Sequence, residues 1–304
     1  MIKLDYFKEK LEVFVGICRN VFYPMIQLTR SRILRQLGLS FISLCCVVIF
    51  AACGSNTPSN NPNSTAGTST NGATTTLKVA LDPTFPPFQS QVGDGKFEGF
   101  DIDLINAVAE AEGLKLDMQG LPFDGIIPAL QAGTADLTIS TMTITPERAK
   151  AVDFSRPYFT SGQAIAVKES TNDVTSYETL KGKKIAVQIG TVGAEKANAA
   201  QAAAVRTFDN TPLALQELIN GNVDAVIADS PVVLYAIKSG SAAGVKVAGN
   251  LLTEEYYGIA TPKGSPNLEK INAGLKTIVE SGKYKQIYQK WFGNIEPPQL
   301  PDKA

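Results

Sequence analysis

The sequence contains no histidine, and its four cysteines all lie within the first 53 residues. Histidine is the commonest general base in enzymes and the commonest metal ligand in proteins. The absence of cysteine after residue 53 excludes a disulfide framework and a cysteine metal site from the rest of the chain. We therefore expect no metal and no cofactor, and a catalytic role would have to rely on carboxylates, lysine or tyrosine.

Neither sign of charge is in excess, because 28 basic and 29 acidic residues give a formal net charge of −1. With 304 residues, of which 44% are hydrophobic and 19% charged, the chain has the composition of a globular protein of about two domains. Removing residues 1–52 would remove seven basic and three acidic residues, which makes the net charge −5. A mildly acidic body argues against nucleic acid as a partner.

The N-terminal region contains an apolar run that is short for a membrane span. Residues 37–52 form an uncharged, mostly apolar run of 16 residues that follows three arginines and precedes Cys53. A membrane span needs about 20 apolar residues, whereas export signals have shorter cores that end in small residues. The ending "FAACGS" resembles a bacterial lipoprotein signal, in which Phe50 takes the place of the usual leucine. We interpret residues 25–52 as a lipoprotein signal peptide and Cys53 as the lipidated residue; an uncleaved anchor helix is the alternative.

Two other N-terminal segments lie outside any folded domain in this interpretation. Residues 1–24 fit no signal pattern and Met25 stands where a signal should begin, so we expect a non-native or mis-assigned extension before it. Residues 53–76 are rich in Ser, Thr and Asn and contain no charged or aromatic residue. Such a segment cannot bury enough apolar surface to fold, and we predict a disordered tether.

From Leu77 onward, short apolar strands alternate with helices, which is the pattern of βαβ units. The pattern predicts strands at residues 77–81, 114–119, 135–140, 183–189, 204–208 and 223–229. It predicts helices at residues 101–112, 124–133, 192–202, 212–220 and 267–293, the first of them capped by Asp101. The expected fold class is α/β, with parallel-type sheets covered by helices.

One structural unit occurs twice in the chain. The segments "IIPALQAGTADLTIS" and "ALQELINGNVDAVIAD" share a helix, a glycine, two residues, an aspartate and a strand. Gly133 and Asp136 of the first correspond to Gly221 and Asp224 of the second, 88 residues later. Two similar half-chains predict two similar lobes rather than one large sheet.

The predicted lobes face each other across a cleft. We assign residues 77–160 and 258–304 to lobe 1 and residues 161–257 to lobe 2, with the segments 163–168 and 256–261 crossing between them. Ligands of open α/β sheets bind beyond the carboxyl ends of the strands. The residues that follow the strands are therefore expected to line the cleft.

Several longer motifs resemble those of one family of solute receptors. The segments "GFDIDLINAVA", "ISTMTITPERAKAVDFSRPY", "GKKIAVQIGT" and "GIATPKGSPNLEKINAGLK" are similar to those of polar amino-acid-binding proteins of ABC importers, the extracellular solute-binding proteins of family 3. Glutamine-binding members are the most similar. The resemblance covers residues 77–293 and implies a type II periplasmic-binding-protein fold, with two α/β lobes, two crossing strands and a ligand cleft between the lobes.

The resemblance also implies partners, location and mechanism. The protein would bind a free polar L-amino acid by lobe closure and deliver it to the permease subunits of an ABC transporter. It would act as a monomer in the periplasm or on the outer face of the cytoplasmic membrane, with a lipid anchor through Cys53. A dehydratase-like enzyme on the same fold is a remote alternative.

Arg148 occupies an unusual position for a basic residue. Thr145 is expected to cap a short helix whose first residue is Pro146, which places Arg148 in the first turn, where the helix dipole disfavours cations. In the family, the residue at this position binds the α-carboxylate of the amino acid in a bidentate pair. The alternative is an ordinary surface ion pair with a neighbouring acid.

The resemblance assigns roles to nine more residues. Ser140, Thr141 and Thr143 would line the site, with Ser140 and Thr143 hydrogen-bonding the ligand's carboxylate and ammonium; ordinary turn chemistry is the alternative. Thr191 would contact the carboxylate from lobe 2, and Asp229 would bind the ammonium; each could instead cap a helix.

The remaining predicted contacts concern the ligand's side chain. Phe85 and Phe123 would sandwich its stem, and core packing is the alternative for both. Asp82 would accept hydrogen bonds from an amide, an ammonium or a guanidinium. Gln188 stands where glutamine-binding members carry lysine, and Ala228 where they carry histidine. We favour glutamine as the ligand, with arginine or lysine as the rival.

Overall fold

The computed structural model describes residues 76–93 and 95–303. The predictions of an extension at residues 1–24, a signal peptide at residues 25–52 and lipidation at Cys53 therefore lie outside the described residues, as does the tether apart from Thr76. Thr76 begins the first strand, one residue before the expected start of the folded body.

The first lobe contains a five-stranded mixed sheet with the order β5-β1-β6-β15-β7. Strand β1 pairs in parallel with β5 and β6, and β15 pairs antiparallel with β6 and β7. The strands are β1 (Thr76–Leu81), β5 (Lys115–Gly120), β6 (Leu137–Thr138), β7 (Val152–Phe154) and β15 (Ala260–Pro262). The helices are α2 (Phe100–Glu112), α3 (Phe123–Gln131), α4 (Arg148–Ala151), α8 (Asn267–Glu280) and α9 (Lys283–Phe292).

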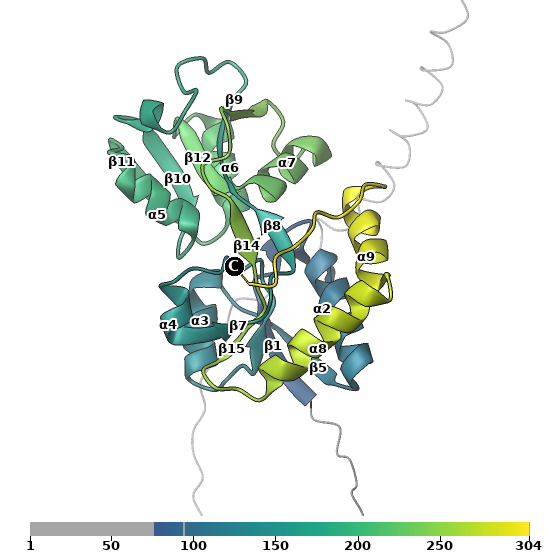
Figure 1. The fold of residues 1–304 in the computed structure, drawn as a ribbon. Helices are drawn as coiled ribbons and strands as arrows, with labels where there is room; N and C mark the ends of the chain where they lie inside the picture. The colour runs from purple at the N-terminus through teal and green to yellow at the C-terminus, as the bar shows by residue number, and fades with distance from the viewer. Residues whose placement is uncertain (1–75, 94, 304) are drawn as a thin grey trace, which may run out of the picture. The chain divides into compact units, whose positions relative to one another are not determined.

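The second lobe contains a sheet with the order β11-β10-β12-β9-β13, of which β11, β10, β12 and β9 are labelled in Figure 1. Its strands are β9 (Gln163–Lys168), β10 (Lys184–Gln188), β11 (Ala204–Phe208), β12 (Ala225–Asp229) and β13 (Val245–Ala248). Its helices are α5 (Val192–Ala199), α6 (Thr211–Asn220) and α7 (Ser230–Ser239), with a short 3-10 helix η1 (Glu178–Leu180). Each lobe has its own apolar core, since buried residues of β1 and α2 belong to one cluster and those of β10 and β12 to others.

The repeated unit of the sequence forms the same substructure in both lobes. In each lobe, the strand of the unit pairs in parallel with a strand that has a second parallel partner: β6 pairs with β1, which also pairs with β5, and β12 pairs with β10, which also pairs with β11. The Asp136 carboxylate accepts from the Lys78 backbone N–H at 2.8 Å, and the Asp224 carboxylate accepts from the Lys184 backbone N–H at 2.7 Å. Each repeated aspartate therefore ties the neighbouring strand, β1 or β10, to the turn between the helix and the strand of its unit.

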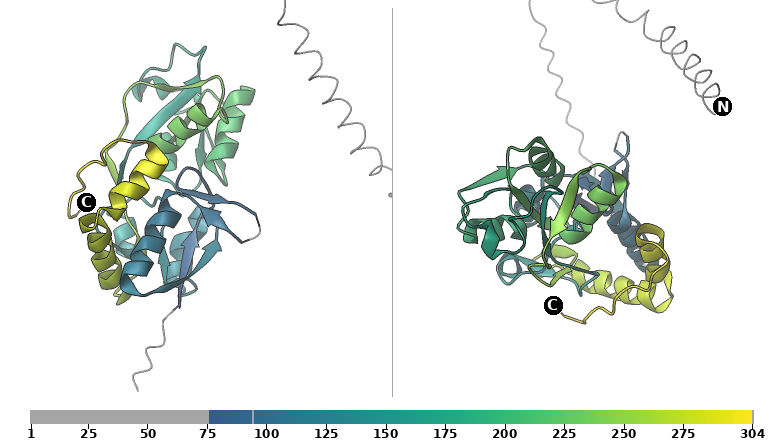
Figure 2. Two further views of the ribbon diagram at one scale, coloured as in Figure 1. Left: turned by 90° about the vertical axis from the view of Figure 1, so that its right-hand side faces the viewer. Right: turned by 90° about the horizontal axis from the view of Figure 1, so that it is seen from above.

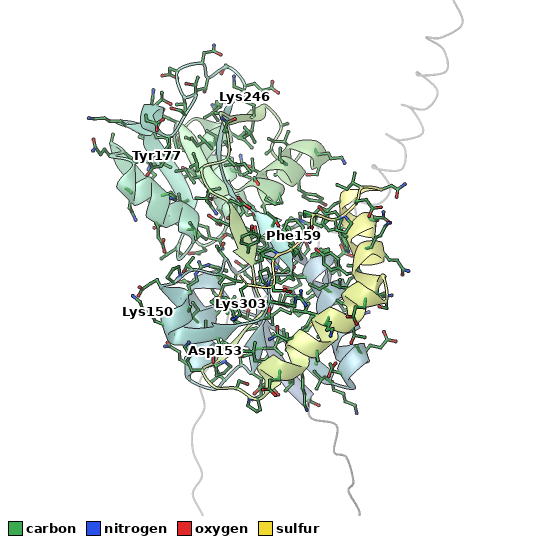
Figure 3. The ribbon with its side chains drawn as sticks, in the orientation of Figure 1. Lys150, Asp153, Phe159, Tyr177, Lys246 and Lys303 are labelled. Atoms are coloured by element: carbon green, nitrogen blue, oxygen red, sulfur yellow. The ribbon has the colours of Figure 1, made fainter. Side chains whose placement is uncertain are left out.

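Two short strands connect the lobes. Strands β8 (Phe159–Ser161) and β14 (Glu255–Tyr257) form an antiparallel two-stranded sheet, seen between the upper and lower sheets in Figure 1. Phe159, labelled in Figure 3, lies in this connecting region and packs against Tyr257 with 5.7 Å between ring centroids.

The prediction that residues 163–168 cross between the lobes is wrong. These residues form β9, which is hydrogen-bonded between β12 and β13 inside the second sheet. The segment "QAIAVK" has five consecutive buried residues, and a central strand that is covered on both faces requires such a continuous run. The prediction for residues 256–261 is correct only for Tyr256 and Tyr257, because Ala260 and Thr261 belong to β15 in the first lobe.

Several helices differ from their predicted form, and α4 begins at Arg148, two residues after the predicted start. Helix α2 begins after Gly99, and Asp101 does not cap it but is fully buried. Helix α5 ends at Ala199, three residues early, and the C-terminal helical segment is divided at Gly282, whose φ of 76° breaks the helix. Both C-terminal helices pack against α2 on the outside of the first lobe (Figures 1 and 2).

Some elements were not predicted. A small three-stranded sheet joins β2 (Thr84–Phe85), β3 (Gln89–Gln91) and β4 (Phe97–Glu98), between β1 and α2. Among the described residues, no helix combines the length and the apolar character that crossing a membrane requires.

Candidate functional site

The residues predicted from the sequence to bind a ligand all line one cavity. The cavity receives side chains from both lobes. Its lining residues are Asp82, Phe85, Phe123, Ser140, Thr141, Thr143, Arg148, Gln188, Thr191, Val192 and Asp229. Val192 is the one that was not predicted; it is the first residue of α5, directly after Thr191.

Strand topology explains why these residues meet. Asp82 follows β1 and Ser140 lies two residues beyond β6, while Gln188 and Asp229 end β10 and β12. The carboxyl ends of parallel strands share one edge of a sheet, so each lobe presents its polar residues along one edge. Within the first lobe, the Ser140 hydroxyl accepts from the Asp82 backbone N–H at 2.9 Å.

Arg148 is buried, with 9% of its surface exposed, which excludes the alternative of a surface ion pair. Its Nη1 donates to the Thr143 carbonyl at 2.9 Å, and its Nη2 donates to the Gly190 carbonyl at 3.0 Å. Gly190 belongs to the second lobe, so the guanidinium spans the cleft. The Phe123 ring lies beneath it, 5.3 Å from ring centroid to guanidinium carbon.

The local fold holds this guanidinium at the start of α4. The Thr145 hydroxyl accepts from the Arg148 backbone N–H at 3.2 Å, the contact expected of a capping threonine. Burial lowers the pKa of Arg148, while the negative charges of Asp229, Glu195 and Glu255 oppose this shift. The guanidinium has five N–H donors, so further donors are available for a carboxylate in addition to the two used here.

Asp229 faces Arg148 from the second lobe. Its carboxylate accepts from Gln163 Nε2 at 2.6 Å and from Tyr257 Oη at 2.5 Å. It stands at the N-cap position of α7 but makes no side-chain capping hydrogen bond, so the capping alternative is not realised. Burial raises the pKa of Asp229 to about 6, against the hydrogen bond from Tyr257, and the charge of Glu255 raises the pKa further.

Asp82 is the second acid of the cavity. Its Oδ1 accepts from the Thr84 hydroxyl at 2.6 Å, and its Oδ2 accepts from Gln188 Nε2 at 2.8 Å, across the cleft. The side-chain oxygen Oε1 of Gln188 in turn accepts from the Thr211 hydroxyl at 2.9 Å. Burial raises the pKa of Asp82, and Asp124 adds to the shift.

The hydroxyl residues of the site combine structural and lining roles. Thr191 caps α5 by accepting from the Ala194 backbone N–H at 3.2 Å and donates to the Gln188 carbonyl at 2.8 Å. The predicted capping alternative for Thr191 is therefore real, although the residue also lines the cavity. Thr141 adopts a left-handed backbone with φ of 48°, which is uncommon for a residue other than glycine.

Phe85 and Phe123 both pack against apolar clusters and line the cavity. Phe85 is 7% exposed and belongs to the core cluster of the first lobe, whereas Phe123 is half-buried and packs against a smaller cluster. Both present part of their surface to the cavity. Within residues 76–93 and 95–303, no group of three or more acidic or cysteine side chains is arranged to hold a metal ion.

A known family matches most of the described chain. The family model for bacterial extracellular solute-binding proteins, family 3, matches residues 77–294. The chain belongs to this family. Membership confirms the resemblance drawn from the sequence motifs, and with it the two-lobed type II fold.

Relatives of this family 3 protein are named for several amino acids. A probable histidine-binding protein of Neisseria gonorrhoeae is 34% identical, and the match covers 82% of this chain and 92% of that protein. The ABC transporter glutamine-binding protein GlnH of Bacillus subtilis (strain 168) is 34% identical, and the match covers 84% of this chain and 96% of that protein. An ancestral arginine-binding protein has been solved bound to arginine and also bound to glutamine. It is 48% identical with a TM-score of 0.68, and the match covers 72% of this chain and 98% of that protein.

Proposed function

We propose that the protein captures a free L-amino acid with a cationic side chain, arginine foremost, and delivers it to the permease of an ABC importer. One observation carries the proposal: a buried guanidinium, Arg148, and two buried carboxylates, Asp82 and Asp229, line a single cleft between two lobes. These three groups match the three charges of a basic amino acid. The family and the names of the relatives support the transport class.

Recognition of the common part of an amino acid needs one cation and one anion. In the proposal, the α-carboxylate pairs with the Arg148 guanidinium and receives further hydrogen bonds from Ser140 and from Thr191 at the start of α5, where backbone N–H groups favour an anion. The α-ammonium pairs with Asp229. Each charge-assisted hydrogen bond contributes about 1.5–3 kcal/mol. Several of them exceed the total of about −8 kcal/mol for micromolar binding, and the ordering of lobes and ligand offsets the excess.

The side-chain preference follows from charge balance. The cavity lining contains two acids and one base, and the zwitterionic part of a ligand adds no net charge. An amino acid with a neutral side chain would leave one buried carboxylate, Asp82, without a counter-ion, which is costly. A guanidinium or ammonium on the ligand neutralises it.

Glutamine, which the sequence motifs favour, remains the second candidate. The Gln188 amide already donates to Asp82 at 2.8 Å, so an amide N–H₂ group is compatible with this carboxylate. The ancestral arginine-binding relative, which has been solved with either amino acid, supports both candidates.

The proposed mechanism is capture by lobe closure around β8 and β14. Contacts across the cleft, from Arg148 to Gly190 and from Gln188 to Asp82, would hold the lobes together around the ligand and exclude water. Closure of this kind is a hinge motion that brings preformed half-sites together. Only the closed form would dock on the permease, with the protein held at the membrane by a lipid on Cys53.

Calorimetric titration of the purified protein with each of the twenty amino acids tests the proposal. We expect the tightest binding for arginine, near micromolar, and recovery of the amino acid unchanged after long incubation. Tighter binding of glutamine would overturn the charge-balance argument alone. Binding of none of the twenty would overturn the proposed function, and chemical conversion of the ligand would favour the dehydratase-like alternative.

A further inference from the structure

A buried glutamate outside the predicted site is hydrogen-bonded to residues of both lobes. Glu255 lies on the crossing strand β14, where it pairs with Ser161 of β8, and only 6% of its surface is exposed. Glu255 does not line the cavity. Burying a carboxylate is costly unless hydrogen bonds compensate, so its position calls for an explanation.

The hydrogen bonds of Glu255 reach residues on each side of the hinge. Its Oε2 accepts from the Thr143 hydroxyl at 2.9 Å, and Thr143 belongs to the first lobe and lines the cavity. The same oxygen accepts from Gln163 Nε2 at 3.1 Å, and Oε1 accepts from the Thr253 hydroxyl at 2.7 Å. Thr253 also accepts from the Gln163 backbone N–H at 2.8 Å, which closes the network in the second lobe.

Gln163 joins Glu255 to Asp229. Its amide nitrogen has two hydrogens and donates to Asp229 Oδ1 at 2.6 Å as well as to Glu255 Oε2. Two carboxylates therefore share one neutral amide group, and their negative charges lie close together in a buried environment. The positive group that faces them is Arg148, which also fixes Thr143 through the carbonyl of that residue.

We propose that Glu255 is a positioning residue for amino-acid recognition, which fixes Thr143 and Gln163 from the hinge and adds a second negative charge behind Asp229 to attract the ligand's ammonium. The inference rests on the proposed function, because it assigns the ammonium to Asp229. Glu255 also links the binding site to the hinge, because it lies on the crossing strand β14 and its side chain is hydrogen-bonded to residues of both lobes.

The electrostatics agree with this arrangement. The charge of Glu255 raises the pKa of Asp229, while Tyr257, Gln163 and Arg148 act in the opposite direction. A ligand ammonium beside Asp229 would relieve the repulsion between the two carboxylates. Removing the charge of Glu255 should therefore lower the pKa of Asp229 and weaken the attraction for an ammonium at the same time.

The test compares Glu255→Gln with Glu254→Gln. The two glutamates are neighbours and lose the same charge, but Glu254 is exposed and its carboxylate accepts from the Tyr256 hydroxyl at 2.7 Å. Dissociation constants for L-arginine and L-glutamine are measured from pH 5 to 8 for both variants and the unmodified protein. For Glu255→Gln we expect binding at pH 7 to weaken by about tenfold, the loss of one charge-assisted contact.

The pH profile separates positioning from a merely structural role. In the unmodified protein, affinity should fall as the pH drops through about 6, where Asp229 takes up a proton. In Glu255→Gln this fall should move to lower pH, and Glu254→Gln should match the unmodified protein. Unchanged affinity and an unchanged midpoint in Glu255→Gln would overturn the proposal.

Other outcomes are also decisive. If the unmodified protein binds neither amino acid, the proposed function fails, and the role of Glu255 fails with it. If Glu255→Gln does not fold, Thr253→Val removes the hydroxyl that donates to Glu255 and accepts from the Gln163 backbone N–H, and it leaves the charge of Glu255 in place. That variant should bind more weakly with the same pH midpoint, and unchanged affinity would contradict the role of Glu255.

Discussion

At the scale of single residues, the site uses side chains where local rules disfavour them. Arg148 stands at the start of a helix, and Thr141 has a left-handed backbone without being glycine. Asp82 and Asp229 are carboxylates in buried positions that raise their pKa. Residues that break local preferences in this way are expected at functional sites, where binding requires them and the rest of the fold compensates for the lost stability. The sequence predicted a helix start near Arg148, although the helix begins at Arg148 itself and not at Pro146.

Asp82→Asn tests whether this carboxylate selects the ligand's side chain. The variant removes the charge without changing the shape, so arginine should lose at least about tenfold in affinity, the value of one buried charge-assisted contact. Glutamine should lose much less, because an amide does not need a counter-ion. Calorimetry with both ligands measures the difference, and Asp117→Asn, which alters an exposed acid of β5 that does not line the cavity, is the control. Equal losses for both ligands would argue against selection by Asp82.

Asp229 predicts a pH dependence of binding. In the free protein its pKa is raised to about 6, and an ammonium beside it favours the ionised form, so the pKa should fall on binding. Binding therefore releases a proton below pH 6, and affinity should be full above that pH and decline by up to about tenfold per unit below it. Asp229→Asn should bind weakly at every pH without this slope. A flat profile in the unmodified protein would remove Asp229 from the ammonium site.

At the scale of helices, strands and loops, a buried acid, Asp101, accepts a hydrogen bond from the loop after β6. Asp101 Oδ2 accepts from the Thr141 backbone N–H at 3.0 Å and from Tyr158 Oη at 2.9 Å, and Gln89 donates to the same oxygen. These bonds stabilise the left-handed backbone of Thr141, which places Ser140 and Thr143 at the cavity. Asp101 was predicted as a helix cap, and its burial could not be foreseen because the β2–β4 segment that supplies Gln89 was not predicted.

Asp101→Asn should make folding stability less dependent on pH. Burial raises the pKa of Asp101 to about 7, against hydrogen bonds from Tyr158 and Thr141, so the folded protein holds this proton more tightly than the unfolded chain. Its contribution is present at pH below about 4 and is lost as the pH rises through 7, on the order of 4 kcal/mol. Urea unfolding at pH 4 to 7 measures this decline, which the variant should reduce. An identical decline in both proteins would contradict the burial argument.

Strand alternation explains what the sequence missed at the hinge. Glu255 and Tyr257 are buried while Tyr256 between them is half-exposed, as expected for a strand with one covered face. The segment 256–261 was predicted as the crossing, so its true start at Glu255 lay just outside. Adding that residue would have placed an acid on the buried face beside Tyr257. In contrast, the strands of the repeated unit were predictable, because glycine, aspartate and apolar run recur in the same order.

At the scale of the whole molecule, two similar halves generate one asymmetric site. The first lobe supplies Arg148 and Asp82, and the second supplies Asp229 and Gln188, so neither lobe alone carries the full set of charges. The repeat in the sequence predicted the two halves, and the family motifs predicted the lining residues that the structure brings together. Which strands join the halves depends on long-range pairing of β9 with β12 and β13, and local sequence does not encode that pairing.

The central claim is that Arg148, reaching across this interlobe cleft, binds the α-carboxylate of a free amino acid. Its most direct test is calorimetry of the unmodified protein and Arg148→Ala, each with arginine and with agmatine, which is arginine without the carboxylate. Arg206→Ala, which removes an exposed arginine of the second lobe, is the control. We predict that Arg148→Ala weakens arginine binding by at least about a hundredfold and leaves the weak binding of agmatine unchanged. Equal losses for the two ligands, or near-normal arginine binding by Arg148→Ala, would contradict it.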